Sequence, residues 1–277
     1  MKRSVFILWL IGIFVVSAEA KPSKPKRIVS TFVGADAILV ELLKNQHQRL
    51  LALSPLSKDA RYSPIYDQIP NGIGDFGSEL ENLLVKKPDL IIAASYTRAA
   101  WLKMLEVAGV PYIVLKDFRN LDDIQNNIAL IAGAIHEKEA GNRLIASIKS
   151  RLEGLKACPL SGKTVVNYSD EGVFMGGNTL FDDLMSRVGL INLASKLGLK
   201  GWSRLSDEAY VSLKPQIIVG LDKDGRTESS LRKKLSSHQL WGPVINRKGV
   251  VVRLVPGRFL SSVSHHSLTA LEMLCAQ

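Results

Sequence analysis

The sequence lacks the short motifs that mark most catalytic chains. Gly176-Gly177-Asn178 is rich in glycine but lacks the spacing of a nucleotide-binding loop, and we interpret it as a tight turn before a helix. Ser264 stands beside His265, yet no strand-turn-helix elbow surrounds a serine, so no catalytic triad is indicated. No pair of carboxylates has the spacing expected of a catalytic acid and base. These absences argue against an enzyme.

Histidine and cysteine are scarce, at five and two residues. A bound zinc or manganese ion needs three or four histidine or carboxylate ligands that converge on it. No histidine follows a predicted strand in the first half of the chain, so we expect no protein-bound metal ion and no cofactor. In an oxidising compartment Cys158 and Cys275 can close one disulfide, which we predict, with two buried free thiols as the alternative.

Only one long apolar run is present. Lys2 and Arg3 precede the run from Val5 to Val16, and the small-residue site Ala18-Glu19-Ala20 follows it. The pattern predicts a secretory signal peptide over residues 1–20, because the run is shorter than the roughly twenty residues of a spanning helix. No cysteine follows the cleavage site to carry a lipid. We therefore expect a soluble periplasmic protein that is not a lipoprotein and has no stable membrane insertion; an uncleaved anchor is the alternative.

The formal charge of +10 raises the question of a nucleic-acid partner. Lysine and arginine are scattered along the chain rather than clustered, and an exported protein meets little nucleic acid. We expect no nucleic-acid partner, and we interpret the charge as an aid to solubility and to the attraction of anionic ligands.

Short runs of Val, Ile and Leu alternate with amphipathic stretches, which predicts an α/β fold with buried parallel strands. In the first half we predict strands at Arg27–Ser30, Leu50–Leu53, Leu90–Ala94 and Tyr112–Leu115, and helices at Ala35–Lys44, Glu79–Val85 and Ala99–Val107. In the second half we predict strands at Thr164–Tyr168, Gln216–Gly220 and Val250–Leu254, and helices at Leu180–Arg187, Ser229–Leu235 and Ser267–Leu274. Each half should form a doubly wound, Rossmann-like lobe, over residues 21–118 and 158–277.

An internal repeat supports the division into two lobes. Glu81 stands seven residues before Pro88 in ELENLLVKKPDLIIA, and Glu208 stands seven residues before Pro215 in DEAYVSLKPQIIVG. Later strands match as well, GVPYIVL beside KGVVVRL. Repeated patterns of this kind indicate related structural units.

Residues 119–157 are expected to be helical and to connect the lobes. Apolar residues from Leu121 to Ile135 step by three and four, and Asp122 and Asp123 suit the first turn of that helix. A second pattern, from about Glu137 to Lys156, predicts a helix of roughly 30 Å. No Pro, Gly or Ser-rich tether occurs, so one long rigid helix should hold the lobes at a nearly fixed distance.

Together these features resemble the iron-siderophore and cobalamin family of periplasmic substrate-binding proteins of ABC importers. The likeness covers nearly the whole chain after the leader. Its most specific segments are PKRIVSTFVGADAILVELL, LENLLVKKPDLIIA, LEVAGVPYIVL, GGNTLFDDLMSRVGLINLA and DEAYVSLKPQIIV. The resemblance implies a monomer that performs no chemistry, carries a small metal chelate such as a ferric siderophore or cobalamin between its lobes, and delivers it to a permease and its ATPase.

The resemblance also implies that one glutamate on each lobe docks onto arginines of the permease. The matching positions are Glu81 and Glu208. Their equivalence in an internal repeat has a physical rationale, because a two-lobed protein must address a two-fold permease with similar surfaces. The alternative is that each is an ordinary solvated helix residue.

Candidate ligand contacts follow from the rule that ligands of open α/β sheets collect beyond the carboxyl ends of the strands. The residues selected by this rule are Thr31, Pro55, Tyr62, Tyr66, Tyr96, Arg98, Trp101, Asp170, Phe174, Trp202, Lys223 and Arg258. Only 6% of the chain is aromatic, yet six of these loop residues are aromatic, and aromatic faces suit large flat ligands. Arginine and lysine can pair with carboxylate or phosphate groups of such a ligand.

Two alternatives stay open. The first is a haem receptor of the same fold, in which His265 or His266 supplies an axial ligand or Tyr62 or Tyr96 a phenolate. The second is an exported transferase on two Rossmann-like lobes, because a fold alone does not fix a function.

Overall fold

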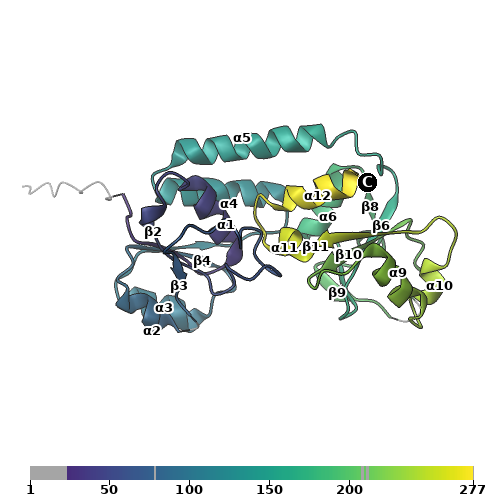
Figure 1. Cartoon of the computed structure of the whole chain (residues 1–277), viewed down its shortest axis with the longest axis horizontal. Helices are drawn as coiled ribbons and strands as arrows, with labels where there is room; N and C mark the ends of the chain where they lie inside the picture. The colour runs from purple at the N-terminus through teal and green to yellow at the C-terminus, as the bar shows by residue number, and fades with distance from the viewer. Residues whose placement is uncertain (1–23, 78, 207–208, 210–211, 277) are drawn as a thin grey trace, which may run out of the picture.

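Two α/β lobes lie side by side in the computed structural model, with two helices along one side of them (Figure 1). The structure describes residues 24–77, 79–206, 209 and 212–276. The predicted signal peptide and Glu208 lie outside the described residues. Among the residues described, no helix is long and apolar enough to cross a membrane.

The first lobe is built on a five-stranded parallel sheet in the order β3-β2-β1-β4-β5. Its strands are β1 (Ile28–Ser30), β2 (Leu50–Leu53), β3 (Gly74–Asp75), β4 (Leu90–Ala94) and β5 (Tyr112–Leu115). The four predicted strands are therefore confirmed, and β4 is buried along its whole length, as expected of a central parallel strand. Strand β3 was not predicted, because two residues carry no readable pattern.

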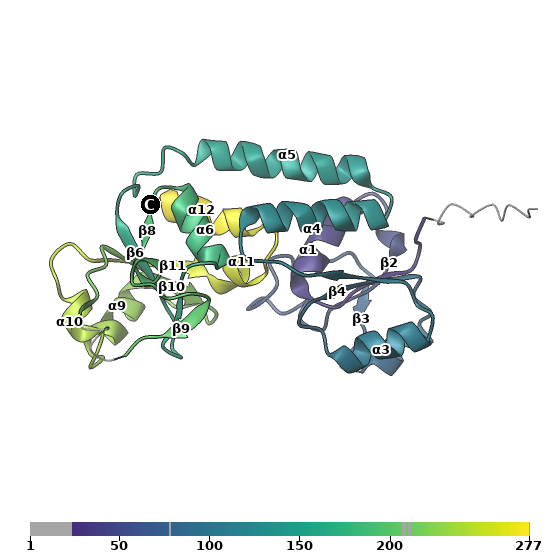
Figure 2. The ribbon, with the colours of Figure 1, turned by 180° about the vertical axis from the view of Figure 1, so that it is seen from behind.

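Helices cover both faces of this sheet. Helix α1 (Val33–Leu42) packs on one face, and α3 (Ala99–Val107) lies on the other (Figure 2). Helix α2 (Leu80–Val85) covers the same face as α3 (Figure 1). Successive side chains of β1 point to opposite faces, so Ile28 joins the cluster under α1 while Val29 joins the cluster under α2 and α3. The strand order switches between β1 and β4: β2 and β3 follow on one side of β1, and β4 and β5 lie on its other side, which creates a crevice at the carboxyl ends of β1 and β4.

The second lobe contains a four-stranded parallel sheet in the order β11-β10-β6-β8. Its strands are β6 (Thr164–Tyr168), β8 (Ile191–Asn192), β10 (Ile217–Asp222) and β11 (Val251–Pro256). Helices α6 (Leu180–Arg187), α7 (Leu193–Lys196), α9 (Glu228–Ser236), α10 (Gly242–Ile245), α11 (Gly257–Ser261) and α12 (Ser267–Cys275) complete the lobe. An antiparallel pair, β7 (Val173–Met175) and β9 (Trp202–Arg204), was not predicted.

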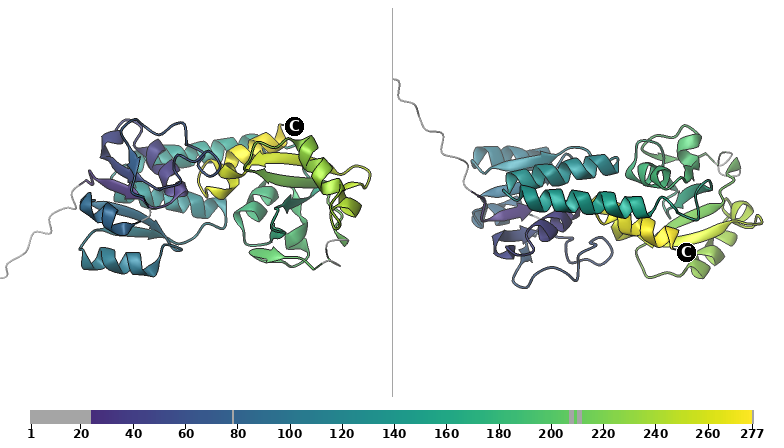
Figure 3. Two further views of the ribbon diagram at one scale, coloured as in Figure 1. Left: turned by 60° about the horizontal axis from the view of Figure 1, so that its bottom comes forward. Right: turned by 90° about the horizontal axis from the view of Figure 1, so that it is seen from above.

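The connection between the lobes consists of two packed helices, α4 (Leu121–Ala134) and α5 (Lys138–Gly154). Asn120 caps α4 by accepting a hydrogen bond from the backbone N–H of Asp123 at 2.7 Å. Helix α5 is the outer of the two and runs from the first lobe to the second, as the view from above shows (Figure 3). The predicted long joining helix corresponds to α5.

Ion pairs tie these helices to the second lobe. Arg187 of α6 contacts Asp122 of α4 at 2.9 Å, and Arg151 of α5 contacts Glu272 of α12 at 2.7 Å. The largest apolar cluster includes residues of both lobes and of α4. Separating the lobes would therefore expose apolar surface as well as break ion pairs.

A disulfide joins Cys158, after α5, to Cys275, at the end of α12. The predicted bridge is thus present in the structure. It closes a segment with a sequence separation of 117, which contains nearly all of the second lobe.

Candidate functional site

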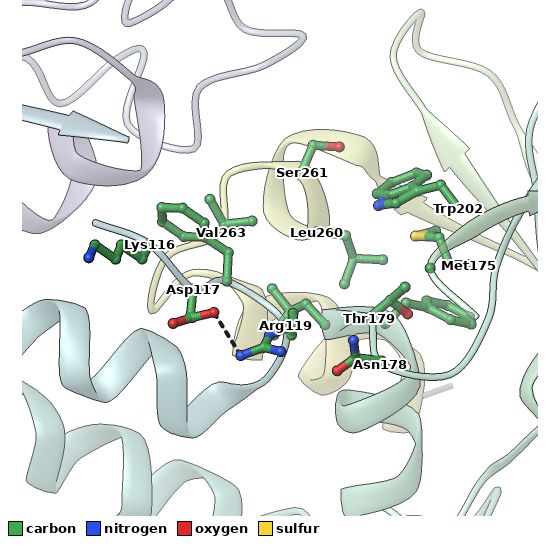
Figure 4. Close-up of a pocket in the computed structure, with 14 residues that line it drawn as sticks. Lys116, Asp117, Arg119, Met175, Asn178, Thr179, Trp202, Leu260, Ser261 and Val263 are labelled. Atoms are coloured by element: carbon green, nitrogen blue, oxygen red, sulfur yellow. Dashed lines mark hydrogen bonds and ion pairs between the residues drawn. The ribbon is translucent and has the colours of Figure 1, made fainter. Parts of the chain in front are cut away.

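A cavity of about 400 Å³ lies between the lobes, and we call it the central cavity. Its lining comes from the loop after β5, the start of α6, the ribbon β7–β9, and the end of α11 with the segment that follows it. Figure 4 shows Trp202, Met175 and Leu260 toward one side of the cavity, with Val263 and Lys116 toward the other. The indole of Trp202 is 69% exposed, so it offers a free aromatic surface to a ligand.

A second cavity of about 400 Å³ lies at the carboxyl ends of β1, β2 and β4, and we call it the α1 cavity. Its lining is Thr31, Phe32, Val33, Gly34, Ser54, Pro55, Leu56, Tyr62, Tyr96, Ser261, Ser262 and Val263. This is the crevice that the strand order predicts. Four of the predicted ligand residues, Thr31, Pro55, Tyr62 and Tyr96, meet in it.

Three aromatic rings stand between the two cavities. Phe32 contacts Tyr96 and Phe118 edge to face, with ring centroids 5.9 and 5.7 Å apart, and Tyr96 lies 5.9 Å from Phe118. Phe118 lines the central cavity, whereas Phe32 and Tyr96 line the α1 cavity. Such pairs stabilise one another, so the three rings form a preorganised aromatic surface.

The segment Ser261–Val263 of the second lobe borders both cavities: Ser261 and Val263 line both of them, and Ser262 lines the α1 cavity. It packs closely on the start of α1, where a Cβ atom at Gly34 would lie 2.5 Å from the carbonyl oxygen of Ser262. Any larger residue at position 34 would push the lobes apart. Val263 has a φ of 47°, a left-handed conformation that is uncommon for a β-branched side chain.

Two cations of the second lobe reach the loop that follows β2 in the first lobe. Arg258 donates a hydrogen bond to the carbonyl oxygen of Ala60 at 3.1 Å, and its guanidinium lies 5.5 Å from the ring of Tyr66. The ammonium of Lys223 lies 5.7 Å from the ring of Tyr62. These cation–π contacts close one side of the interlobe cleft.

A buried carboxyl group holds the start of that loop. Asp36 of α1 is fully buried, and its carboxylate accepts hydrogen bonds from the backbone N–H of Ser54, at 3.1 Å, and from the Ser54 hydroxyl. Burial raises the pKa of Asp36 to about 7, although the hydrogen bonds from Ser54 oppose the shift. Asp36 therefore fixes one edge of the α1 cavity from beneath.

Seven of the twelve predicted contact residues lie outside the linings of the two cavities. Tyr66, Lys223 and Arg258 make the contacts between the lobes described above, and the other four are Arg98, Trp101, Asp170 and Phe174. Phe174 is 1% exposed and packs against Trp241 in the core of the second lobe. Trp101 packs against Phe76 under α3, with Arg98 lying over its ring. The positions of Phe174 and Trp101 after predicted strands favoured ligand contact. Each side chain instead packs against another aromatic residue of its own lobe.

Asp170 forms hydrogen bonds and ion pairs within the second lobe. It accepts hydrogen bonds from Lys234, from Arg226 at 3.0 Å and from the hydroxyl of Tyr168 at 2.7 Å. Partial burial opposes ionisation, but these donors hold the pKa of Asp170 well below its usual range. Its charge is thus already balanced within the lobe.

Other side chains in the cavities were not predicted. Phe118, Met175, Leu260 and Val263 belong to this group. Phe118 follows β5 and could have been found by applying the strand-end rule to that strand as well. Nothing in the sequence marks the other three, because they reach the cleft through contacts between segments far apart in the chain.

None of the five histidines, all of which the structure describes, lines either cavity. The adjacent rings of His265 and His266 lie 4.2 Å apart at the start of α12, with His265 only 6% exposed. This placement argues against the two histidines as axial ligands of a haem in the cavities. Over the part of the chain that the structure describes, no group of three or more His, Cys, Asp or Glu side chains is arranged to hold a metal ion.

Burial lowers the pKa of both histidines, to about 4 for His266, and the charge of Arg151 lowers both further. An unfolded histidine takes up its proton near pH 6.5, so acidification through this range favours the unfolded chain. We expect the free energy of unfolding of the wild type, relative to a His266→Gln variant, to fall as pH decreases from 6.5 to 4. Asp36 titrates in the opposite direction but is common to both chains.

Urea denaturation at several pH values measures this difference. If the difference in free energy of unfolding between the wild type and His266→Gln did not change with pH, His266 would bind its proton equally well in the folded and the unfolded chain.

The model of the periplasmic binding protein family matches residues 28–244 of this chain. An uncharacterized ABC transporter substrate-binding lipoprotein of Bacillus subtilis, YvrC, is 24% identical, with 87% of this chain and 88% of the relative aligned. A vitamin B12-binding protein of Pectobacterium carotovorum is also 24% identical, over 98% of this chain and 94% of the relative.

Solved structures agree in fold. The haem-binding protein RhuT of Roseiflexus superposes with a TM-score of 0.72 at 21% identity, covering 91% of this chain and 97% of that one. The vitamin B12 binding protein BtuF of Vibrio cholerae superposes with a TM-score of 0.66 at 20% identity, covering 91% and 96%. The matched family consists of substrate-binding proteins of transport systems and not of enzymes. Since its model spans most of the sequence, this chain belongs to the periplasmic binding protein family.

Proposed function

We propose that this protein captures a corrinoid such as cobalamin between its lobes in the periplasm and delivers it to the permease of an ABC importer. The observation that carries the proposal is the pair of aromatic-lined cavities between the lobes, with Trp202 on one lobe and Tyr96 on the other. Each cavity has a volume within the usual range for small-molecule sites. Relatives named as vitamin B12-binding proteins support the corrinoid within the wider class of metal chelates.

Chelates with their own metal cage fit this site better than a bare ion. The cavity linings contain aromatic and aliphatic side chains, and the carboxylate of Asp117 is paired with Arg119 at 2.7 Å. Such walls contact the organic part of a ligand and leave the metal to its chelator. Tyr62, Tyr66, Lys223 and Arg258 are proposed to contact the edge of the cargo from the mouth of the cleft.

Haem is the second candidate, favoured by the two tyrosines of the α1 cavity. Tyr62 and Tyr96 each carry a phenol group that can coordinate ferric iron. A ferric siderophore is the third, because Lys116 and Arg119 at the central cavity can pair with an anionic chelate.

Titration of the protein with cobalamin, haem and a panel of ferric siderophores tests the proposal. Tryptophan fluorescence follows binding, and calorimetry excludes optical absorption by these coloured compounds. Saturable one-to-one binding of cobalamin is the expected result. Saturation by haem or a siderophore alone would replace the corrinoid, and binding of none by the folded protein would contradict the proposed function.

Delivery to a permease is proposed to depend on Glu81. This glutamate is exposed on α2, on the opposite side of the molecule from α5 (Figure 1). We expect Glu81→Ala to leave cargo affinity unchanged and to lower uptake by about tenfold, because rim charges govern encounter and register rather than cargo contacts. Uptake of labelled cargo by cells that carry the importer measures the effect.

A matched control is Glu139→Ala, which removes an exposed glutamate from α5. Normal uptake by Glu81→Ala, with Glu208→Ala also normal, would refute the docking assignment.

A further inference from the structure

The loop that follows β2 carries a short turn, residues 58–62, which we call the clasp turn. It lies between Ser57 and Ser63, which are 1% and 0% exposed. On either side of these serines the loop is held by the first lobe, because Ser54 is hydrogen-bonded to α1 and Ile65 is buried in the largest apolar cluster. The clasp turn therefore projects between two fixed points of the first lobe.

Hydrogen bonds within the clasp turn maintain its shape. The carboxylate of Asp59 accepts hydrogen bonds from the backbone N–H of Arg61 at 2.9 Å and from its guanidinium at 2.6 Å. The carbonyl oxygen of Asp59 accepts hydrogen bonds from the N–H groups of Tyr62 and Ser63 at 3.0 and 2.8 Å. Such local bonds hold a turn together without help from other segments. The clasp turn can thus move as a unit when its contacts with the second lobe break.

Two contacts join the clasp turn to the second lobe. Arg258 of α11 donates a hydrogen bond to the carbonyl oxygen of Ala60 at 3.1 Å, and the ammonium of Lys223, directly after β10, lies 5.7 Å from the ring of Tyr62. Ala60 is exposed, and Tyr62 is only partly buried. Single contacts of both kinds are weak where water reaches them, so together they favour the joined state only modestly.

The position of the clasp turn makes its release the smallest movement that widens the cleft. Tyr62 lines the α1 cavity, so the turn borders the space between the lobes. The connecting helices hold the lobes together elsewhere, through the ion pair of Arg151 with Glu272 and the apolar cluster that both lobes contribute to. Rotation of whole lobes would disturb these contacts, whereas movement of the clasp turn breaks only its contacts with Lys223 and Arg258.

We propose that the clasp turn is a gate on one side of the cleft: it closes by binding to Lys223 and Arg258, and cargo enters and leaves when these contacts break. The inference rests on the proposed function for its cargo, while the movement itself can be measured without cargo. If the gate is closed about nine-tenths of the time, association proceeds at about a tenth of the rate of the open protein.

The double variant Lys223→Ala, Arg258→Ala removes both contacts. We expect cobalamin to associate with it about tenfold faster than with the wild type and to dissociate faster as well, as measured by stopped-flow tryptophan fluorescence. The association rate is decisive, because loss of a direct contact with cargo raises the dissociation rate alone. The matched control is Arg143→Ala, Lys149→Ala, which removes the same charge from exposed positions of α5 and should leave both rates unchanged.

A second measurement follows the gate without cargo. Ala60→Cys and Asp224→Cys place thiols on the two sides of the contact, since Asp224 is next to Lys223 in the chain. The native cysteines are joined to each other and do not react with a thiol-specific spin label. Electron paramagnetic resonance should give short, narrowly distributed distances between the two labels, and longer, broader distances once Lys223→Ala and Arg258→Ala are added.

An unchanged association rate in the double variant, or label distances that do not respond to the loss of both cations, would overturn the gate while the proposed function stands. Failure of cobalamin to bind the folded wild type would overturn the proposed function, and the label distances alone would then decide whether the clasp turn opens.

Discussion

Trp202→Ala is expected to weaken cargo binding by about 100-fold, or roughly 3 kcal/mol. The indole is 69% exposed on β9 and lines the central cavity, so a cargo seated there buries it. Large aromatic side chains that a ligand desolvates commonly dominate binding energy, because they remove much apolar area from water at little cost in conformational entropy. Because the side chain is exposed in the free protein, stability should change little.

Calorimetric titration of wild type and Trp202→Ala with the same cargo measures the effect. Val107→Ala is the matched control, since Val107 is 80% exposed on α3 and does not line either cavity. Unchanged affinity in Trp202→Ala would remove the central cavity from the cargo site.

Reduction of the Cys158–Cys275 disulfide is expected to lower the free energy of unfolding by about 4 kcal/mol. The bond closes a segment with a sequence separation of 117, and a cross-link over so long a segment removes much conformational entropy from the unfolded chain. Cys158 follows α5 and Cys275 ends α12, so the bond also ties the C-terminal end of the chain to the connecting helices.

Urea denaturation with and without reductant measures this loss. The Cys158→Ala, Cys275→Ala double variant should show the lower stability and no further response to reductant. Equal stability of the oxidised and reduced wild type would show that the bond constrains the unfolded chain far less than its segment length implies.

Most of the fold follows from local sequence pattern. The runs at Leu90–Ala94 and Thr164–Tyr168 are rich in apolar residues and bounded by polar residues, and both form strands at the predicted positions. The pair β7–β9 was not predicted, because a three-residue strand is too short to show an alternation of apolar and polar residues. The two strands also lie far apart in the chain.

The site could be predicted only where strand order determines it. Thr31 and Tyr96 follow β1 and β4, and they reach the α1 cavity because the carboxyl ends of these strands meet at one edge of the sheet. Phe174 also follows a predicted strand, but the ribbon β7–β9 turns it into the core. Whether a loop aromatic faces ligand or core depends on tertiary packing, which local pattern does not encode.

The arrangement suits capture without chemistry. Ion pairs from α4 and α5 and a common apolar cluster hold the lobes together, so we expect limited hinge motion on binding. A cleft that is largely formed in advance loses little conformational entropy when cargo enters.

A crystal structure of the protein with cobalamin tests the central claim most directly. We predict one molecule between the lobes, in contact with Trp202 of one lobe and Tyr96 of the other. Cobalamin bound on an outer face, away from both residues, would contradict the interlobe cleft as the cargo site.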